Sequence, residues 1–362
     1  MAWTTLLGRL RHAVRPARTA ILRGAGEAEN VGDLMMRHTA QKLLAALGFE
    51  TVYTVGHGDS PAALSSAAGS VDAIFVLGSL QFSDAWAAPT LSERLERAAS
   101  FHQHFPTAKV VFLPSTWGAF EPRHKDPLQR LVAGAQVLVR DRFSAEAING
   151  ALGSSVAAYC PDLAFSYPLA EAELARPLLE RSAAGGTRPF IGIVPNQRCI
   201  EAGVTPLQDP EHYFEYLAGA RDFALARGFN VVGLSHMVNT DRDLLLLERL
   251  GIEYVPANDV TLIRSVIANL TACICSRYHG LVSCLSHGTP VIALGWHHKY
   301  RNLMNDMGLG AYHLSVGELP RDPAPLLDEL CTNHDGVRRT IVRNVGAARQ
   351  IMEARTRALP WS

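Results

Sequence analysis

Short apolar runs alternate with longer helical patterns along most of this chain of 362 residues, and this alternation limits the folds that are open to it. The runs are nearly continuous, which is typical of strands buried on both faces. Such strands, separated by helices, predict a parallel sheet with helices on both sides. The runs are Thr19–Arg23, Glu50–Val55, Asp72–Leu77, Lys109–Leu113, Gln136–Arg140 and Val156–Cys160, and then Phe190–Val194, Asn230–Leu234, Glu253–Val255, Ala272–Cys275 and Val291–Leu294.

An interruption separates the two series of runs. The segment Ala170–Arg188 is rich in Ala, Glu and Leu and closes on a turn-prone Gly-Gly-Thr-Arg-Pro stretch. We therefore predict an α/β protein of two doubly wound Rossmann-like domains that face a cleft, with ligands beyond the carboxyl ends of the strands. The predicted parts are a basic segment at 1–18, a first domain at 19–167, a linker at 168–188, a second domain at 189–320 and closing helices at 321–362.

Composition excludes several classes of protein. The 34 basic and 34 acidic side chains balance, which argues against a general nucleic-acid binder that needs many phosphate contacts. The six cysteines have no CxxC spacing, as expected for reduced thiols in a cytoplasmic protein. No apolar run reaches the ~18 residues of a membrane span.

The arginine-rich segment between Met1 and Gly26 leaves two alternatives, an exposed first helix or a basic helix in peripheral contact with anionic lipid.

The segment Ser276-Arg-Tyr-His-Gly280 carries the clearest chemical signal. It follows the apolar strand that ends at Cys275, so Ser276 is expected to cap a helix that closes at Gly288. Arg277 and His279 then fall in the first turn, where the helix dipole already favours an anion. We interpret the cations placed there as ligands of a carboxylate or phosphate. The alternative is an arginine paired with a nearby acid and a capping histidine.

Other candidate residues follow neighbouring strands. Lys299 comes after the next strand, within Gly295-Trp-His-His-Lys, on the same edge of the sheet as Arg277. The adjacent His297 and His298 invite a metal interpretation, but adjacent residues rarely bind one ion and no carboxylate or cysteine completes a set, so we expect no metal. Cleft residues expected in the first domain are Asn30, Gly32 and Asp33 after its first strand and Arg140 at the end of a later one.

Taken together, the sequence resembles the polysaccharide pyruvyl transferase family from about residue 30 to 310. The resemblance rests on five motifs that occur in the family's order. They are Asn30-x-Gly32-Asp33, Val139-Arg140-Asp141 with Ser144, Pro161-Asp162-x-Ala164-Phe165, Ser276-Arg277-Tyr278-His279-Gly280, and the run that begins at Gly288-Thr-Pro with Lys299 downstream.

The resemblance implies a glycosyltransferase-B-like pair of domains and a transferase of cell-surface glycan or exopolysaccharide biosynthesis. Such an enzyme moves the pyruvyl group of phosphoenolpyruvate onto two hydroxyls of a saccharide and forms a cyclic ketal, without a metal or other cofactor. In that scheme Arg277, Lys299 and Arg198 bind the donor. His279 is the general acid, and Asp33 is the candidate base.

Two other functions remain open from the sequence. A nucleotide-sugar glycosyltransferase of the same fold would need a site for uracil and ribose, which the segment around Glu253–Asp259 offers. A non-catalytic saccharide-binding protein would leave Arg277, His279 and Lys299 unexplained. The acceptor sugar and its nucleotide, lipid or polymer carrier are likewise open.

Overall fold

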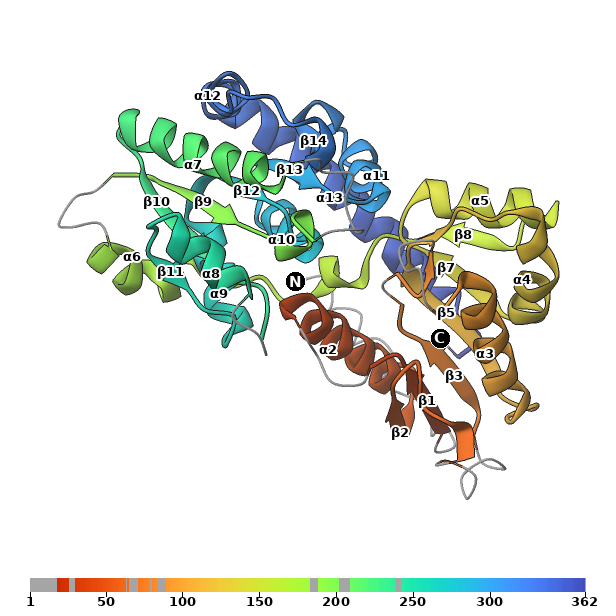
Figure 1. Ribbon diagram of the computed structural model, residues 1–362. Coiled ribbons are helices and arrows are strands. Elements are labelled where there is room, and N and C mark those ends of the chain that lie inside the picture. Colours follow the sequence, from red (N-terminus) through yellow and green to blue (C-terminus); the bar gives the residue numbers. More distant parts are fainter. Residues whose placement is uncertain are drawn as a thin grey trace. The chain divides into compact units, whose positions relative to one another are not determined.

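A computed structural model describes residues 18–25, 30–62, 64, 71–78, 80–83, 89–182, 188–201, 209–238 and 242–361. Two six-stranded parallel sheets form its framework (Figure 1). The chain divides into two compact units, the first of 1–28, 36–167 and 348–362 and the second of 29–35 and 168–347. The basic segment 1–18 lies outside the described residues except for Arg18, so its contact with membranes stays a prediction.

The first unit contains the strands that the sequence predicts for the first domain, in the order β2-β1-β3-β5-β7-β8. These strands are β1 (Arg18–Arg23), β2 (Phe49–Val55), β3 (Ala73–Val76), β5 (Lys109–Ser115), β7 (Gln136–Val139) and β8 (Ala157–Tyr159). A two-stranded pair, β4 (Phe82–Ser83) and β6 (Trp117–Gly118), lies beside them. The helices are α2 (Val31–Ala46), α3 (Leu91–Gln103), α4 (Lys125–Val132) and α5 (Arg142–Leu152).

Alternating strand residues supply both faces of the first sheet. Ile21, Ile74 and Phe112 belong to one buried cluster that also contains apolar residues of α3 and α4. Phe75, next to Ile74, turns the other way and packs against Trp361 near the end of the chain. Both faces of the sheet are therefore covered, as near-continuous apolar strands require.

The second unit has the strand order β11-β10-β9-β12-β13-β14. Its strands are β9 (Phe190–Val194), β10 (Asn230–Leu234), β11 (Tyr254–Val255), β12 (Leu270–Cys275), β13 (Val291–Gly295) and β14 (His313–Ser315). Its helices are α6 (Arg176–Ser182), α7 (Pro210–Ala226), α8 (Arg242–Arg249), α9 (Val260–Ala268), α10 (Tyr278–His287), α11 (His298–Asp306), α12 (Ala324–Thr332) and α13 (His334–Arg357).

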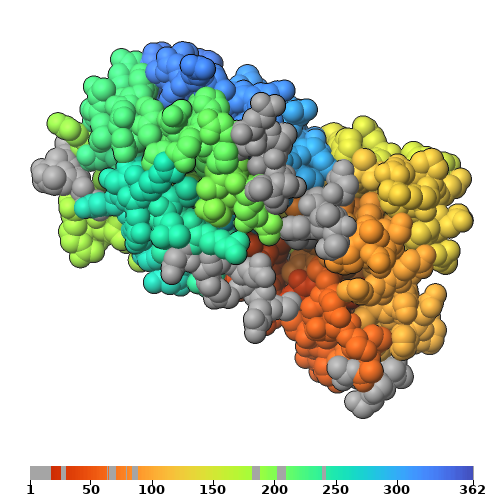
Figure 2. All heavy atoms as spheres, viewed as in Figure 1, coloured from red at the N-terminus to blue at the C-terminus, as the bar shows by residue number. Residues whose placement is uncertain are grey.

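Helices lie on both sides of the second sheet. Figure 1 shows α7 and α12 on one side of the sheet and α8 and α9 on the other. Helix α7 (green) contacts helix α12 (blue), and the two lie next to each other on the surface drawn in Figure 2. The segment that we expected to be a linker folds in part onto this unit. A 3-10 helix at Ala172–Ala175 packs on α9, where Ala175 N–H donates to Ser265 Oγ at 2.9 Å. Helix α13 contributes residues to both units.

The strand order of the second unit locates its ligand site. Renumbered along the chain it reads 3-2-1-4-5-6, the doubly wound order in which connections leave in opposite directions from the two central strands. Those strands are β9 and β12, paired in parallel with Cys275 beside Val194. A crevice between their carboxyl ends is where such folds bind ligands. Within the part of the chain that the structure describes, no helix is long and apolar enough to cross a membrane.

Two buried histidines of the first unit predict acid sensitivity. Burial and the nearby Arg23 cation lower the pKa of His57 to about 4 and that of His102 to about 3. In the unfolded chain both titrate near 6.5, so the unfolded state takes up protons first as the pH falls. The stability that depends on their neutrality is complete above pH 6.5 and is lost below it. We expect each to lower the free energy of unfolding by up to ~1.4 kcal/mol per pH unit between 6.5 and its folded pKa.

Urea unfolding at pH 7.0, 6.0 and 5.0 tests this expectation. His102→Gln should flatten the pH dependence, because it removes one of the two buried imidazoles. An unfolding free energy that stays constant from pH 7 to 5 would contradict the assignment.

Candidate functional site

Polar residues follow four adjacent strands at the carboxyl edge of the second sheet. Asn196 and Arg198 follow β9, His236 follows β10, the Ser276–His279 segment follows β12, and Lys299 follows β13. Carboxyl ends of parallel strands meet at one edge of a sheet, so the topology brings these side chains to the predicted crevice.

A buried hydrogen-bond network fixes the crossing from β9 to β12. Asn196 Nδ2 donates to the carbonyl of Ser276 at 2.9 Å, and Tyr300 OH donates to the same carbonyl at 2.9 Å. Tyr213 OH donates to Ser276 Oγ at 2.7 Å and accepts from Asn196 N–H at 3.1 Å. Burial raises the pKa values of both tyrosines, which keeps them neutral donors. The backbone that carries Arg277 is therefore held rigidly.

Ser276 does not cap the following helix, contrary to our expectation. Helix α10 starts at Tyr278 with Arg277 as its N-cap, and no side chain caps it. The physical reason is that the Ser276 hydroxyl is already engaged by Tyr213. Arg277 thus precedes the first turn, which His279 occupies. Gly288 closes the helix in the left-handed conformation at φ 74°, as the sequence predicts.

Arg277 forms a two-pronged ion pair with the fully buried Asp243 at the start of α8. Its Nε lies 2.9 Å from Oδ2 and its Nη2 lies 2.5 Å from Oδ1. Asp243 also accepts from Gln197 N–H at 3.2 Å. Burial alone would lower the pKa of Arg277, but the Asp243 charge and hydrogen bonds raise it above its ordinary value. The pairing with an acid that we considered as the alternative is present, and it leaves Nη1 as the guanidinium nitrogen outside the pair.

His279 lies directly against the first turn of α2. A Cβ added to Gly32 would overlap the Nδ1 and Cγ atoms of the His279 ring, so only glycine fits there. Asn30 caps this turn: its Oδ1 accepts from Gly32 N–H at 2.9 Å and Asp33 N–H at 3.1 Å, and its Nδ2 donates to Asp33 Oδ2 at 2.7 Å. Gly32 thus lets the backbone of this turn approach the imidazole closely, and its place in a ligand cleft remains a prediction.

The first turn of α2 belongs to the second compact unit. Residues 29–35 cluster with that unit, although the sequence placed them in the first domain. Asn30 pairs with Met237 after β10, and Val31 N–H donates to the His236 carbonyl at 3.0 Å. The structure therefore brings Asn30, Gly32 and Asp33 together with His279.

Lys299 sits among aromatic rings at the start of α11. Its Nζ lies 5.1 Å from the ring centre of Trp296, 5.3 Å from that of Tyr300 and 5.6 Å from that of Tyr278. The face of an aromatic ring attracts a cation, so these three rings favour an ammonium position near the carboxyl end of β13.

His297 and His298 have structural roles in the same segment. His297 Nδ1 accepts from Lys299 N–H at 3.3 Å and caps α11, and the centres of the two imidazole rings lie 4.0 Å apart with the planes tilted by 38°. In the described ranges no group of three or more His, Cys, Asp or Glu side chains is placed to hold a metal ion.

Arg198 and Arg140 are both engaged in ion pairs. Arg198 lies beside the Asn196 turn with its Nη1 2.8 Å from Glu201, which also contacts Arg242 at 3.1 Å. Arg140 belongs to the first unit, where its Nη1 lies 2.8 Å from Asp162 and its side chain is 1% exposed. Its Nε donates to Thr116 at 2.8 Å. Arg140 thus joins two motif segments from within that unit, and its predicted role at an acceptor remains a prediction.

Sequence reasoning missed Asp243 and His236. His236 could have been found, because it follows a predicted strand just as Arg277 does. Asp243 carried no comparable signal, since an acid in the first turn of an amphipathic helix is common.

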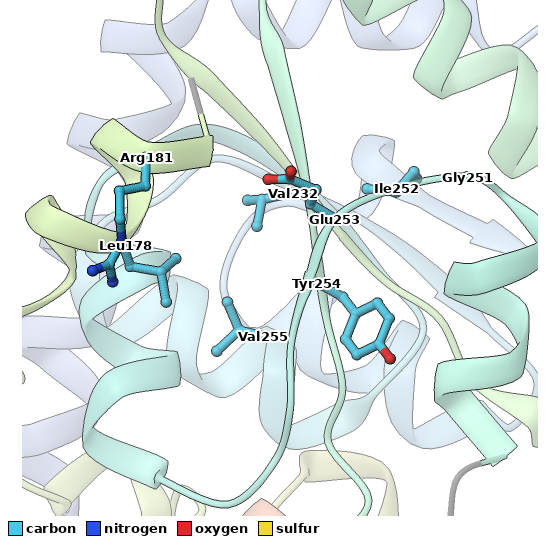
Figure 3. A pocket seen from close by; sticks show the side chains of 8 residues that line it. All are labelled: Leu178, Arg181, Val232, Gly251, Ile252, Glu253, Tyr254 and Val255. Atoms are coloured by element: carbon cyan, nitrogen blue, oxygen red, sulfur yellow. The ribbon is translucent and has the colours of Figure 1, made fainter. Parts of the chain in front are cut away.

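A separate hollow of about 620 Å³ lies beside β11, the strand at one end of the second sheet (Figure 3). Leu178 and Arg181 of α6 line one side, and the segment before and within β11 lines the other, with Tyr254 and Val255 labelled in Figure 3. Glu253 and Tyr254 belong to the stretch that we considered for a nucleotide. None of Arg198, Arg277, His279 and Lys299 lines this hollow.

Comparison with known proteins identifies related sequences and folds. A family model described as polysaccharide pyruvyl transferase matches residues 30–298. No curated protein matches the sequence.

Several solved structures share the fold. UDP-bound MnaA of S. aureus matches with a TM-score of 0.56 at 9% identity over 90% of each chain. The trehalose-phosphate synthase of Burkholderia xenovorans matches at 0.55 and 9% over 94% of this chain and 99% of that one. UDP-GlcNAc 2-epimerase of Neisseria meningitidis matches at 0.52 and 9% over 93% and 98%. Such low identities speak for the fold alone. They confirm the predicted α/β class with two Rossmann-like domains of the glycosyltransferase-B kind.

Proposed function

Because the chain belongs to the polysaccharide pyruvyl transferase family, we propose that it transfers the pyruvyl group of phosphoenolpyruvate onto two hydroxyls of one saccharide, forming a cyclic ketal and releasing phosphate. The observation that carries this proposal is that Arg277 and His279 follow β12 and Lys299 follows the adjacent β13 at the same carboxyl edge, with Lys299 Nζ 5.6 Å from the ring centre of Tyr278. The donor has a carboxylate and a phosphate, and this edge offers cations and a helix N-terminus to both.

The ion pair with Asp243 gives Arg277 a fixed orientation. Its Nε and Nη2 atoms contact Asp243, which fixes the guanidinium plane. Nη1 is then the nitrogen that we propose for an oxygen of phosphoenolpyruvate. Lys299 adds a compact positive charge, and three aromatic rings surround its ammonium group. Arg198 reaches the same edge with Glu201 as its companion.

The reaction needs a proton at C3 of the donor and removal of the hydroxyl protons. His279 is the proposed acid, because its imidazole lies in the first turn of α10 against Gly32, at the edge where the donor is proposed to bind. Asp33 is the candidate base from the sequence, and its Oδ2 accepts a hydrogen bond from Asn30. Neither role requires a metal or other cofactor.

Phosphate release from phosphoenolpyruvate tests this function directly. The purified chain is incubated with the donor and a panel of nucleotide-linked and lipid-linked sugars. We expect acceptor-dependent phosphate release and a mass gain of one pyruvyl ketal on the acceptor. Calorimetry should show binding of phosphoenolpyruvate and only weak binding of uridine diphosphate.

The rival function is a nucleotide-sugar glycosyltransferase. Its support is the hollow beside Glu253 and Tyr254, in a fold whose solved examples include a UDP complex. Tight binding of uridine diphosphate with none for phosphoenolpyruvate would replace our proposal with this rival. If the rival function is right, Tyr254→Ala should weaken the binding of uridine diphosphate. If our proposal is right, the same substitution should leave phosphoenolpyruvate turnover unchanged.

A further inference from the structure

A second histidine, His236, lies buried at the same edge of the second sheet. It follows β10, the strand beside β9, and only 2% of its surface is exposed. Its carbonyl accepts from Val31 N–H at 3.0 Å, and the next residue, Met237, pairs with Asn30. A Cβ added to Gly280 would lie 3.5 Å from its Cε1. The backbone of His236 is therefore bound to the start of α2, and its ring lies against the first turn of α10, near His279.

The Nε2 atom of His236 is buried and, within the described ranges, has no hydrogen bond that would explain its polarity. A buried nitrogen without a hydrogen-bond partner destabilises the fold relative to a satisfied one. An apolar residue of similar size would fill the space without that cost. The cost is offset if the nitrogen meets a ligand.

The charges around His236 indicate which ligand it meets. The groups that act on it are Arg277 before α10, His279 on α10 and Arg264 on α9. On the other neighbouring elements, Asp243 of α8 is paired with Arg277, and Asp33 of α2 accepts from Asn30. Burial, followed by the electrostatic effects of these three groups, lowers the pKa of His236 to about 3. The ring is neutral in the free protein. A negatively charged ligand bound in the crevice would favour its protonated form.

We infer that His236 is a second catalytic residue, which accepts a proton from the saccharide hydroxyl while His279 delivers one to the donor. This inference rests on the proposed function and refines it. It assigns to His236 the proton for which Asp33 was the sequence-based candidate.

The two imidazoles balance the protons over both halves of the reaction. In the first, an acceptor hydroxyl oxygen bonds to C2 of phosphoenolpyruvate, and the electrons of the C2–C3 double bond form a C3–H bond with the proton of His279. His236 Nε2 takes the hydroxyl proton. In the second, the other hydroxyl bonds to C2 as the C2–O bond to phosphate breaks. That hydroxyl proton passes to His279, and the proton on His236 leaves with phosphate. Both residues return to their starting states.

Histidine NMR on the full-length protein provides a test that does not require turnover. With labelled histidine, His236 is assigned from the signal absent in His236→Gln. In the free protein we expect no titration of this ring between pH 5.5 and 8. With saturating phosphoenolpyruvate and no acceptor, its pKa should rise far enough for the ring to titrate between pH 5.5 and 8. A ring that responds to neither phosphoenolpyruvate nor inorganic phosphate overturns the inference.

Kinetics of His236→Gln provides the second test. We expect kcat to fall roughly 10²- to 10³-fold, with the calorimetric Kd for phosphoenolpyruvate within about threefold and with one limb of the kcat–pH profile lost. The matched control is His313→Gln, because burial also lowers the pKa of His313, to about 4, and it lies on β14. Its kcat should stay within about threefold of wild type. Asp33→Asn separates the two candidate bases.

The outcomes distinguish this inference from the proposed function. Wild-type protein that releases no phosphate with any acceptor contradicts the function. Wild-type turnover that survives in folded His236→Gln contradicts the inference alone. If His236→Gln fails to fold, the wild-type titration with phosphoenolpyruvate, assigned through His236→Asn, still decides the point.

Discussion

Replacing His279 with Gln should lower kcat by roughly 10²- to 10⁴-fold while the affinity for phosphoenolpyruvate changes far less. Glutamine retains a polar end of similar reach but cannot deliver a proton to C3. The proposed donor contacts from Arg277 and Lys299 should stay in place, because Arg277 is paired with Asp243 and Lys299 lies among aromatic rings, independently of the imidazole. The measurement is steady-state phosphate release with the Kd obtained separately by calorimetry.

Arg277→Lys should show the reverse pattern. A lysine cannot make both contacts with Asp243, and it offers one charge in place of a planar fork. We expect donor binding to weaken at least tenfold, with a smaller change in kcat at saturation. If His279→Gln keeps the wild-type kcat and loses only affinity, His279 is a donor ligand and Lys299 becomes the next candidate for the acid.

Strands buried on both faces are the part of this fold that the sequence predicts well. β9 and β10 occupy the residues expected for them, because their apolar runs end sharply at Pro195 and Ser235. β14 was missed. It is three residues long and contains His313 and Ser315, so its strand conformation depends on pairing with β13 rather than on its own pattern.

The site was predictable where chemistry follows directly on a strand. Arg277 and His279 follow β12, so their common edge could be deduced before any contact was known. Charge pairing could not be deduced. Arg277 and Arg140 look alike in sequence, each at a strand end, yet Arg140 is sealed against Asp162, whereas the Arg277 side chain keeps 16% of its surface exposed beside Asp243. The difference lies in which acid the tertiary fold brings near.

The contact between Gly32 and His279 was also beyond the sequence, and it gives our last prediction. Gly32→Ala should reduce kcat about 10²-fold or more without removing any functional group. An added methyl would overlap the Nδ1, Cγ and Cβ atoms of His279, so the ring or the first turn of α2 must move. A displacement of about 1 Å is enough to spoil proton delivery. Calorimetric binding of phosphoenolpyruvate should stay within about threefold.

The control is Gly346→Ala in α13, where an added Cβ meets nothing within 4 Å. Replacing a helical glycine that has open space around it with alanine should raise the free energy of unfolding by up to about 1 kcal/mol and leave kcat unchanged. Gly32 is also helical, so propensity alone would make both substitutions stabilising. If Gly32→Ala raises Tm as Gly346→Ala does and leaves kcat intact, the imidazole is free to move and its position does not limit turnover. A loss of kcat with a Tm near wild type means that Gly32 acts through the placement of His279.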